Sequence, residues 1–319
     1  MKILLSLYIV LIIGCSASIP YVPEEQPLDF GQRPEPNIQM SIPGLSSCTD
    51  SPDQTLKLNS NHPITVLVHG CKGSAGRFRS LAELYAFHGQ QAVCFSYDDR
   101  DSLVDSAKRL ALSTSELSKN MENNNISIIG HSMGGLVARR ALENKKDNVL
   151  LNTPKNISLA TVSAPLAGIK AAETCGSKPL QWLSLGIIPG TCWIATGDNW
   201  NEITSSSDFI KRPRELLPSI EKYIKVVTDE RDTCRIDPNT GQCHQSDFVF
   251  DLFEQYHPVV DKYHQTTNIE VNAGHVEIVG YKGLAPRKLI KILQENEMLF
   301  PTPPERQASL EKLLATLYD

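Results

Sequence analysis

The segment that decides the fold is Ile126-Ser127-Ile128-Ile129-Gly130-His131-Ser132-Met133-Gly134-Gly135-Leu136-Val137-Ala138-Arg139-Arg140. Its first four residues are mostly apolar and β-branched, as is typical of a buried strand. Residues 130–134 fit the pattern Gly-x-Ser-x-Gly, and the residues that follow favour a helix. In such a strand–turn–helix the serine is strained at the tip of the turn, and the small residues on either side let strand and helix pack closely. We therefore expect the Ser132 hydroxyl to stand at the end of a strand, open to another molecule.

This motif in this context resembles the serine lipases and esterases of the α/β-hydrolase superfamily, especially those with a Gly-His-Ser-Met-Gly-Gly turn. The resemblance implies an α/β-hydrolase fold, which is a mostly parallel twisted sheet with helices on both faces and an inserted cap. Hydrophobic periodicity along the chain independently favours alternating strands and helices, and therefore a parallel sheet covered on both sides. We expect strands at 64–68, 91–96, 126–129, 157–162, 223–228 and 268–271, and helices at 78–88, 102–121 and 286–297.

Composition narrows the class of protein. A chain of 319 residues that is 41% hydrophobic can bury a large core, and one α/β domain with insertions fits it better than two domains. The net charge is only −5 and no long basic run occurs, which argues against a nucleic-acid partner. The histidines and cysteines show no metal-ligand spacing, so we expect neither a metal nor a cofactor.

The first residues of the chain are predicted to form an export signal. Residues 3–13 form an almost unbroken apolar run, which is too short to span a bilayer but typical of a secretory signal. The sequence Ile12-Ile13-Gly14-Cys15 resembles the lipobox of bacterial lipoproteins, which implies that Cys15 is lipidated and anchors the protein to a membrane. Ser16 after the cysteine then favours the outer membrane or cell surface. The alternatives are an ordinary signal peptide cut near Ala17, giving a secreted protein, and a buried first strand.

The chain is expected to divide into four parts. Residues 1–18 are the signal and lipobox region. Residues 19–48 contain six prolines among polar residues and show no periodicity, which indicates an extended linker. This linker is either a tether between lipid and enzyme or a strap over the domain surface. The hydrolase domain follows at 49–300, and a tail at 301–319 ends in an amphipathic helix.

A second motif lies at the end of the strand predicted at 64–68, which runs into His69-Gly70-Cys71. In the lipases that the chain resembles, such a strand end precedes the oxyanion-hole loop. The chemistry requires backbone N–H groups directed at the oxygen that becomes negative when a carbonyl is attacked. We assign these donors to the N–H groups of Cys71 and Met133. The alternative is a simple glycine-rich turn.

The resemblance also implies an acid and a base. The strand at 223–228 runs into Asp229-Glu230-Arg231-Asp232, like the hydrolase strand end that carries the acid. Asp232 is the predicted acid, because residues 230–232 match the family's Glu-x-Asp form, and Asp229 is the alternative. Some lipases instead carry the acid after the strand at 157–162, but this chain has Ser163-Ala164-Pro165 there.

His275 is the predicted base, because it comes late in the chain, after a short strand and beside Gly274. The order Ser132, Asp232, His275 is that of the α/β-hydrolases. The separation of 43 positions between Asp232 and His275 is longer than expected, so we predict an insertion around 248–264.

Residues 169–222 are the predicted cap. All three tryptophans of the chain lie there, interleaved with leucine and isoleucine, and they favour the lining of an apolar acyl pocket. They are Trp182, Trp193 and Trp200. The alternative is a small core of the insertion itself.

The cysteines can form disulfides, which are typical of exported proteins. Cys175 and Cys192 could staple the cap. A local disulfide is expected between Cys234 and Cys243, which bracket a strong turn sequence.

The resemblance implies hydrolysis of lipid-like carboxylic esters through an acyl-enzyme on Ser132. Lysophospholipase, thioesterase and acyltransferase activities are alternatives within the same chemistry. The Val-Ser-Ala-Pro-Leu-Ala segment at 162–167 is also similar to lipid deacylases of the GPI-inositol-deacylase kind. A catalytically silent binding protein on the same fold is the alternative of a different class.

Overall fold

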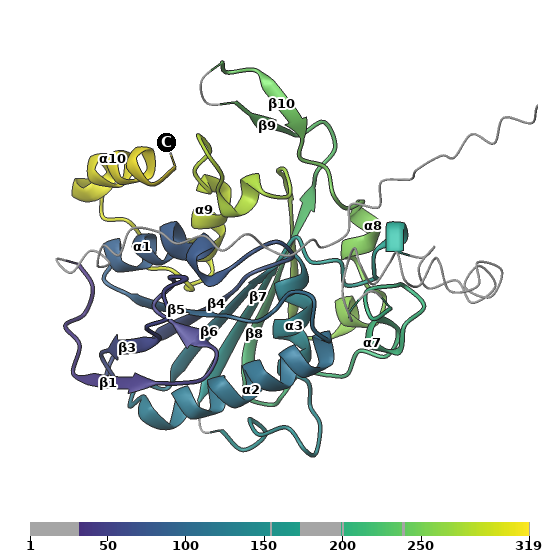
Figure 1. Cartoon of the computed structure of the whole chain (residues 1–319), viewed down its shortest axis with the longest axis horizontal. Helices are drawn as coiled ribbons and strands as arrows, with labels where there is room; N and C mark the ends of the chain where they lie inside the picture. Colours follow the sequence, from purple (N-terminus) through teal and green to yellow (C-terminus); the bar gives the residue numbers. More distant parts are fainter. Residues whose placement is uncertain (1–31, 154, 173–198, 200, 238–239, 319) are drawn as a thin grey trace, which may run out of the picture.

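A seven-stranded sheet in the order β11-β8-β7-β6-β4-β5-β2 forms the centre of the protein, in a computed structural model that describes residues 32–153, 155–172, 199, 201–237 and 240–318 (Figure 1). Its members pair in parallel except β2, which lies antiparallel at one edge. The strands are β2 (Leu45–Ser46), β4 (Ile64–Val68), β5 (Gln91–Phe95), β6 (Asn125–His131), β7 (Asn156–Val162), β8 (Ile220–Asp229) and β11 (Thr266–Asn272). The predicted mostly parallel sheet is confirmed.

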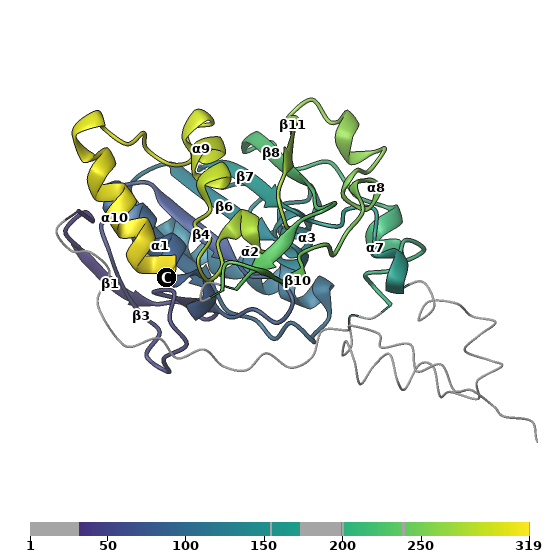
Figure 2. The same cartoon turned by 90° about the horizontal axis from the view of Figure 1, so that it is seen from above.

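Helices cover both faces of this sheet (Figure 2). One face carries α2 (Leu103–Asn120) and α3 (Met133–Ala141), and the other carries α1 (Arg79–Phe87), α9 (Arg287–Glu295) and α10 (Gln307–Tyr318). Each face has its own hydrophobic cluster: Val66 and Val68 belong to the first and Leu67 to the second. All five residues of β4 are buried, because a strand covered on both sides has no solvent face.

The segment before β4 is part of the domain. Strand β1 (Ile38–Ser41) pairs with β3 (Thr55–Leu58), and β2 extends the central sheet. A disulfide joins Cys48 to Cys94 on β5. The prediction of a linker through residue 48 is therefore wrong for residues 38–48, where buried apolar side chains and the disulfide outweigh the proline-rich composition.

The chain between β8 and β11 is a longer insertion than the predicted 248–264, because it also includes a hairpin before residue 248. It contains the hairpin β9 (Cys234–Ile236) and β10 (Cys243–Ser246), which projects from the domain in Figure 1, followed by α8 (Leu252–Gln255) and the 3-10 helix η4 (Val260–Lys262). The expected disulfide between Cys234 and Cys243 is confirmed. The other short helices among the described residues are η1 (Ala75–Phe78), η2 (Lys170–Ala172), α7 (Asp208–Lys211), η5 (Glu277–Val279) and η6 (Pro304–Arg306).

The predicted C-terminal helix is α10. Leu310, Leu314 and Tyr318 are buried in the cluster that α1 and α9 also share, so this helix belongs to the domain rather than to a separate tail. Along the described part of the chain, no helix has both the length and the apolar character needed to cross a membrane. The predicted signal and lipobox region at residues 1–18, with Cys15, lies outside the described residues.

Candidate active site

Ser132 stands between the last residue of β6 and the first residue of α3. Its backbone angles are φ 55° and ψ −127°, although residues other than glycine rarely take a positive φ. Such a conformation costs about 1–3 kcal/mol and persists only where the surroundings fix it. The predicted strand, strained serine and helix are confirmed, but the Ser132 side chain is buried and not open as expected.

Glycines allow this turn to form. A Cβ atom on Gly130 would overlap the carbonyl oxygen of Gly134, and a Cβ on Gly134 would overlap the carbonyl oxygens of Val68 and His69. The start of α3 is thus pressed against the end of β4, where only a residue without a side chain fits.

The structure brings His275 to Ser132, as the sequence predicted. His275 Nε2 lies 3.1 Å from Ser132 Oγ, and both side chains are buried. His131 holds the backbone of the loop that carries His275, because its Nε2–H donates to the carbonyl oxygen of His275 at 2.8 Å. Burial and the nearby His275 lower the pKa of His131 to about 3, so His131 is neutral near pH 7.

The acid beside His275 is Glu230, which the sequence analysis did not choose. His275 Nδ1 lies 2.9 Å from Glu230 Oε1. Asp232 is exposed in the turn after β8, and Asp229 forms an ion pair with Arg231. The assignments to Asp232 and to the alternative Asp229 are therefore wrong.

The pleat of β8 explains this correction. Successive side chains of a strand point to opposite faces, so Glu230 continues the face of Thr228 and Asp229 points the other way. Thr228 is fully buried and Glu230 is 1% exposed. This alternation distinguishes Glu230 from Asp229 but not from Asp232, which has the same parity, so the sequence alone did not identify Glu230.

Hydrogen bonds keep the buried Glu230 ionised. Its Oε2 accepts the N–H groups of Val249 at 2.6 Å and Phe250 at 2.8 Å. Burial alone would raise the pKa of Glu230, but the hydrogen bond and charge of His275, with further bonds from Ser163 and Phe250, hold it below its usual range. Glu230 is thus a carboxylate at neutral pH.

Asp247 fixes the histidine loop, and no sequence motif pointed to it. Its carboxylate accepts the N–H groups of Val276 at 2.9 Å and Glu277 at 3.0 Å, and its carbonyl accepts the N–H of His275 at 2.9 Å. Arg235 on β9 pairs with the same carboxylate at 2.8 Å. The insertion between β8 and β11 therefore shapes the loop that carries His275.

The loop predicted to form the oxyanion hole lies against Ser132. A Cβ on Gly70 would lie 2.8 Å from Ser132 Cβ, so the backbone before Cys71 touches the nucleophile turn. The loop is closed by a hydrogen bond from Gly73 N–H to Gly70 O at 3.1 Å, and Lys72 N–H donates to the carboxylate of Asp99. Cys71 itself is in a disulfide. Both predicted donors, on Cys71 and Met133, thus belong to segments that adjoin Ser132.

The predicted substrate-binding tryptophans, Trp182, Trp193 and Trp200, lie outside the described residues, as do Cys175 and Cys192. Of the predicted cap, residues 169–172, 199 and 201–222 are described, among them Asn199. It is fully buried, and its side-chain amide donates to the carbonyl oxygen of Asp99 at 2.6 Å and lies 3.6 Å from the sulfur of Met133. This part of the cap therefore reaches the segments beside Ser132.

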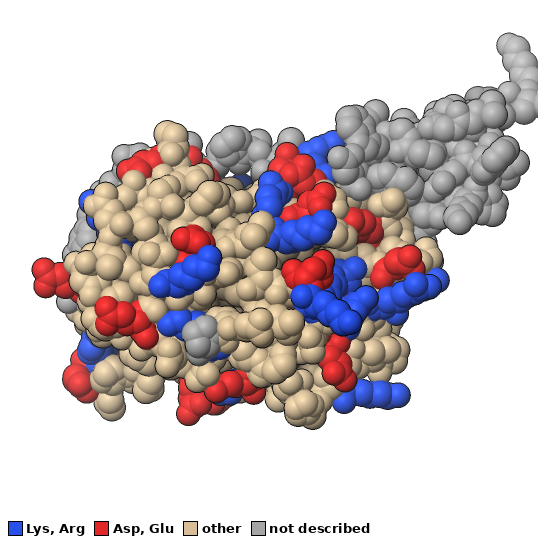
Figure 3. Space-filling view, turned by 90° about the horizontal axis from the view of Figure 1, so that it is seen from below, with Lys and Arg blue, Asp and Glu red and all other residues tan. Residues whose placement is uncertain are grey.

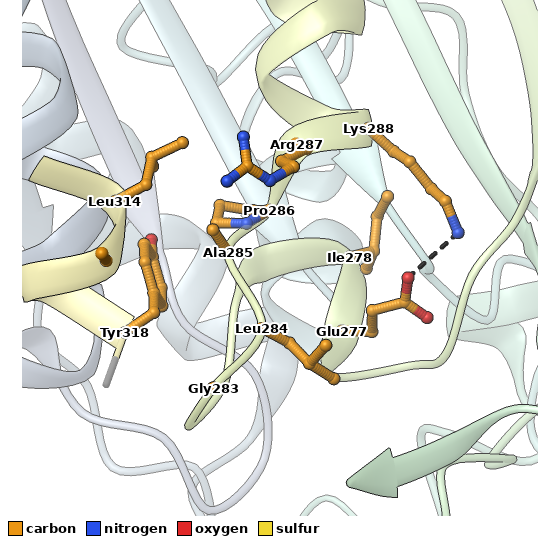
Figure 4. A pocket seen from close by; sticks show the side chains of 11 residues that line it. Glu277, Ile278, Gly283, Leu284, Ala285, Pro286, Arg287, Lys288, Leu314 and Tyr318 are labelled. Carbon is orange, nitrogen blue, oxygen red and sulfur yellow. Dashed lines mark hydrogen bonds and ion pairs between the residues drawn. The ribbon is translucent and has the colours of Figure 1, made fainter. Parts of the chain in front are cut away.

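A cavity of about 410 Å³ lies away from these residues, between the start of α9 and α10 (Figure 4). Pro286, Arg287 and Tyr318 are among the residues that line it, and Ser132, Glu230 and His275 are not. Arg287 pairs with Glu311 on α10. The cavity is therefore not the place where Ser132 would meet a substrate.

Surface charges of opposite sign are interspersed. On the face seen in Figure 3, Lys and Arg side chains lie next to Asp and Glu. The ion pairs on α2 include Lys108 with Asp105 at 3.3 Å and Lys119 with Glu116 at 3.1 Å. Within the described ranges, no group of three or more His, Cys, Asp or Glu side chains could hold a metal ion.

Sheet order, the strained turn and the position of His275 define an α/β-hydrolase fold, and comparison with known proteins agrees. Residues 59–191 match the family described as "Putative serine esterase (DUF676)". This match includes Ser132 but ends before Glu230 and His275. No curated protein sequence matches the chain significantly.

Among solved structures, the mature form of the Bacillus licheniformis lipase BlEst2 is similar over 84% of this chain and 100% of its own, with 15% identity and a TM-score of 0.51. The product of the Listeria innocua gene lin2722 is similar over 76% of this chain and 96% of its own, with 14% identity and a TM-score of 0.45. Because the identity to BlEst2 is only 15%, this similarity shows the fold alone.

Proposed function

We propose that this protein is a serine hydrolase that cleaves carboxylic esters through an acyl-enzyme on Ser132. The observation that carries the proposal is the buried chain of contacts from Ser132 Oγ to His275 Nε2 at 3.1 Å and from His275 Nδ1 to Glu230 Oε1 at 2.9 Å. A nucleophile, a base and a group that orients the base, each within hydrogen-bonding distance, are the arrangement that activates a serine. The match of residues 59–191 to a serine esterase family supports the same chemistry.

Each residue has a role in this proposal. His275 Nε2 takes the proton of Ser132 as Oγ attacks the ester carbonyl, and then gives it to the leaving alcohol. The N–H groups of Cys71 and Met133 stabilise the negative oxygen of the tetrahedral intermediate. A water molecule then attacks the acyl-enzyme by the same steps, with His275 taking its proton. Glu230 keeps the proton of neutral His275 on Nδ1 and stabilises the imidazolium that forms.

Lipid-like esters are the proposed substrates. The tryptophans and branched side chains of residues 169–222 favour an apolar acyl pocket, and BlEst2 is described as a lipase. Lysophospholipase, thioesterase and lipid deacylase activities use the same serine chemistry on other leaving groups. Export and anchoring through lipidated Cys15 are also part of the proposal, because the apolar run and lipobox-like sequence precede the domain.

The test is Ser132→Ala. The variant should lose hydrolysis of p-nitrophenyl esters and labelling by a fluorophosphonate probe while keeping the unfolding midpoint of the wild type. Ser127→Ala, on the same strand, is the matched control and should retain both activities. Wild-type turnover by Ser132→Ala would refute the proposal, and so would a wild-type protein that neither labels nor hydrolyses esters, the result expected of a silent binding protein. A series of oxyesters and thioesters of rising chain length then separates lipase from thioesterase activity.

A further inference from the structure

We propose that Ser163 is a positioning residue whose hydroxyl bridges His275 and Glu230 and holds the imidazole in the tautomer that Ser132 needs. The inference rests on the proposed function of the same site. Ser163 is the first residue after β7, the strand next to β6. Its N–H donates to the carbonyl oxygen of Val226 at 2.9 Å, which holds it against β8.

Three polar atoms meet at this point. Ser163 Oγ lies 2.8 Å from His275 Nδ1 and 2.6 Å from Glu230 Oε1, and these two partners lie 2.9 Å from each other. The hydroxyl therefore contacts both members of the base–acid pair. Thr228 Oγ1 lies 2.8 Å from Ser163 Oγ and 2.9 Å from Glu230 Oε1, on the same side.

The positions of the protons follow from this geometry. A carboxylate can only accept, so the Ser163 O–H donates to Glu230 and its lone pairs remain to accept from His275 and Thr228. His275 can donate to Ser163 and Glu230 only when its proton is on Nδ1. Nε2 of neutral His275 is then unprotonated and can take the proton of Ser132. When the imidazolium forms, its Nδ1–H can donate to both Ser163 Oγ and Glu230 Oε1, whereas without the Ser163 hydroxyl it could donate to Glu230 alone.

Backbone strain marks the same position. Ser163 has φ 46° and Ser132 has φ 55°, so two neighbouring strand ends both place a serine in the left-handed region. Strain of this kind clusters at functional sites, where the surroundings over-determine it. Ser163 is fully buried, so it cannot meet a substrate and acts only through His275 and Glu230.

The first experiment is Ser163→Ala, assayed with p-nitrophenyl esters. The kcat should fall roughly 10- to 100-fold, as expected for the loss of one hydrogen bond to a charged group, while KM stays within about twofold. Ser106→Ala is the matched control, because Ser106 is an equally buried serine on α2, outside the site, and should keep the wild-type kcat. A wild-type kcat in Ser163→Ala would overturn the proposal.

The second experiment separates positioning from a merely structural role. Glu230→Gln removes the acid, and Ser163→Asp in the same chain offers a new carboxylate to Nδ1. Aspartate is one of the residues that tolerate the left-handed region, so the backbone can accept it. The double variant should be at least about tenfold more active than Glu230→Gln alone. A double variant no more active than Glu230→Gln overturns the proposal, because a structural serine predicts no rescue.

Failure of this inference can be distinguished from failure of the proposed function. If the wild type is not labelled by the fluorophosphonate probe and cleaves no ester, the proposed function fails and the role of Ser163 fails with it. If the wild type is labelled and Ser163→Ala is labelled at the same rate, only the role of Ser163 fails.

Discussion

The two sides of the His275 imidazole are built in different ways. On the Nε2 side, Ser132 is held by close backbone contacts that require Gly130 and Gly134. On the Nδ1 side, Glu230 is held by hydrogen bonds from backbone N–H groups and from hydroxyls. The close backbone contacts around Ser132 form a steric lock, in which no side chain fits at the glycine positions. Each hydrogen bond around Glu230, in contrast, adds a modest amount of stabilisation. Substitutions at the glycines should therefore change folding, and substitutions around Glu230 should change turnover.

The largest expected effect is on the Nδ1 side of His275, where Glu230 lies. Glu230→Gln should lower kcat by about 10³- to 10⁴-fold, because a neutral amide neither stabilises the imidazolium nor enforces the required tautomer. The unfolding midpoint should change little by comparison. Steady-state kinetics with an activated ester and a urea titration measure the two quantities.

Matched controls for this prediction are Asp232→Asn and Asp229→Asn, one on either side of Glu230. Neither side chain contacts His275, so both variants should keep kcat within about twofold; a surface carboxylate is worth little. A larger loss in Asp232→Asn than in Glu230→Gln would return the acid to the residue that the motif favoured.

The next largest effect is expected on the Nε2 side of His275, where glycines allow the nucleophile turn to pack against β4. Gly134→Ala should lower the free energy of unfolding by about 3 kcal/mol, since its Cβ would overlap the carbonyl oxygens of Val68 and His69 at the end of β4. Gly241→Ala is the control: its φ is 66° and no atom lies within 4 Å of the added Cβ. It should cost only about 1 kcal/mol. Equal costs in urea unfolding would contradict a steric lock at the nucleophile turn.

The same contrast explains what the sequence could and could not predict. The nucleophile turn is contiguous, so its glycines, its serine and the flanking apolar run stand together in residues 126–140. The surroundings of Glu230 come from β7, β8 and the insertion that carries Val249 and Phe250, and no local pattern reports which of three neighbouring carboxylates those segments face.

Residues 38–48 were misjudged for a similar reason. The prolines of residues 19–48 indicate an extended chain, and an extended chain can equally pair with an existing strand. What decides between the two is the partner: β3 and β5 supply the hydrogen bonds, and Cys94 supplies the disulfide to Cys48. None of these partners is adjacent in sequence, so composition alone could not identify them.

The smallest expected effect concerns His131, which joins the two sides because it lies in the nucleophile turn and donates to the carbonyl oxygen of His275. Its pKa in the folded protein is about 3, against an ordinary value of 6.5. Between these values the unfolded chain binds a proton that the folded protein does not, so stability rises with pH. The contribution of His131 is complete above about pH 6.5 and is lost as the pH falls toward 3. Between pH 6.5 and pH 5 it should account for a loss of about 2 kcal/mol.

His131→Gln tests this contribution in urea titrations at pH 6.5 and pH 5. The variant should lose about 2 kcal/mol less than the wild type on acidification, because glutamine does not titrate. Burial also lowers the pKa values of His69, His88 and His257, but these residues are present in both proteins and cancel in the comparison. His62→Gln, at an exposed position, should show the wild-type loss. If His131→Gln loses as much stability on acidification as the wild type does, then His131 takes up a proton in the folded protein as readily as in the unfolded chain, and its pKa is not lowered by burial.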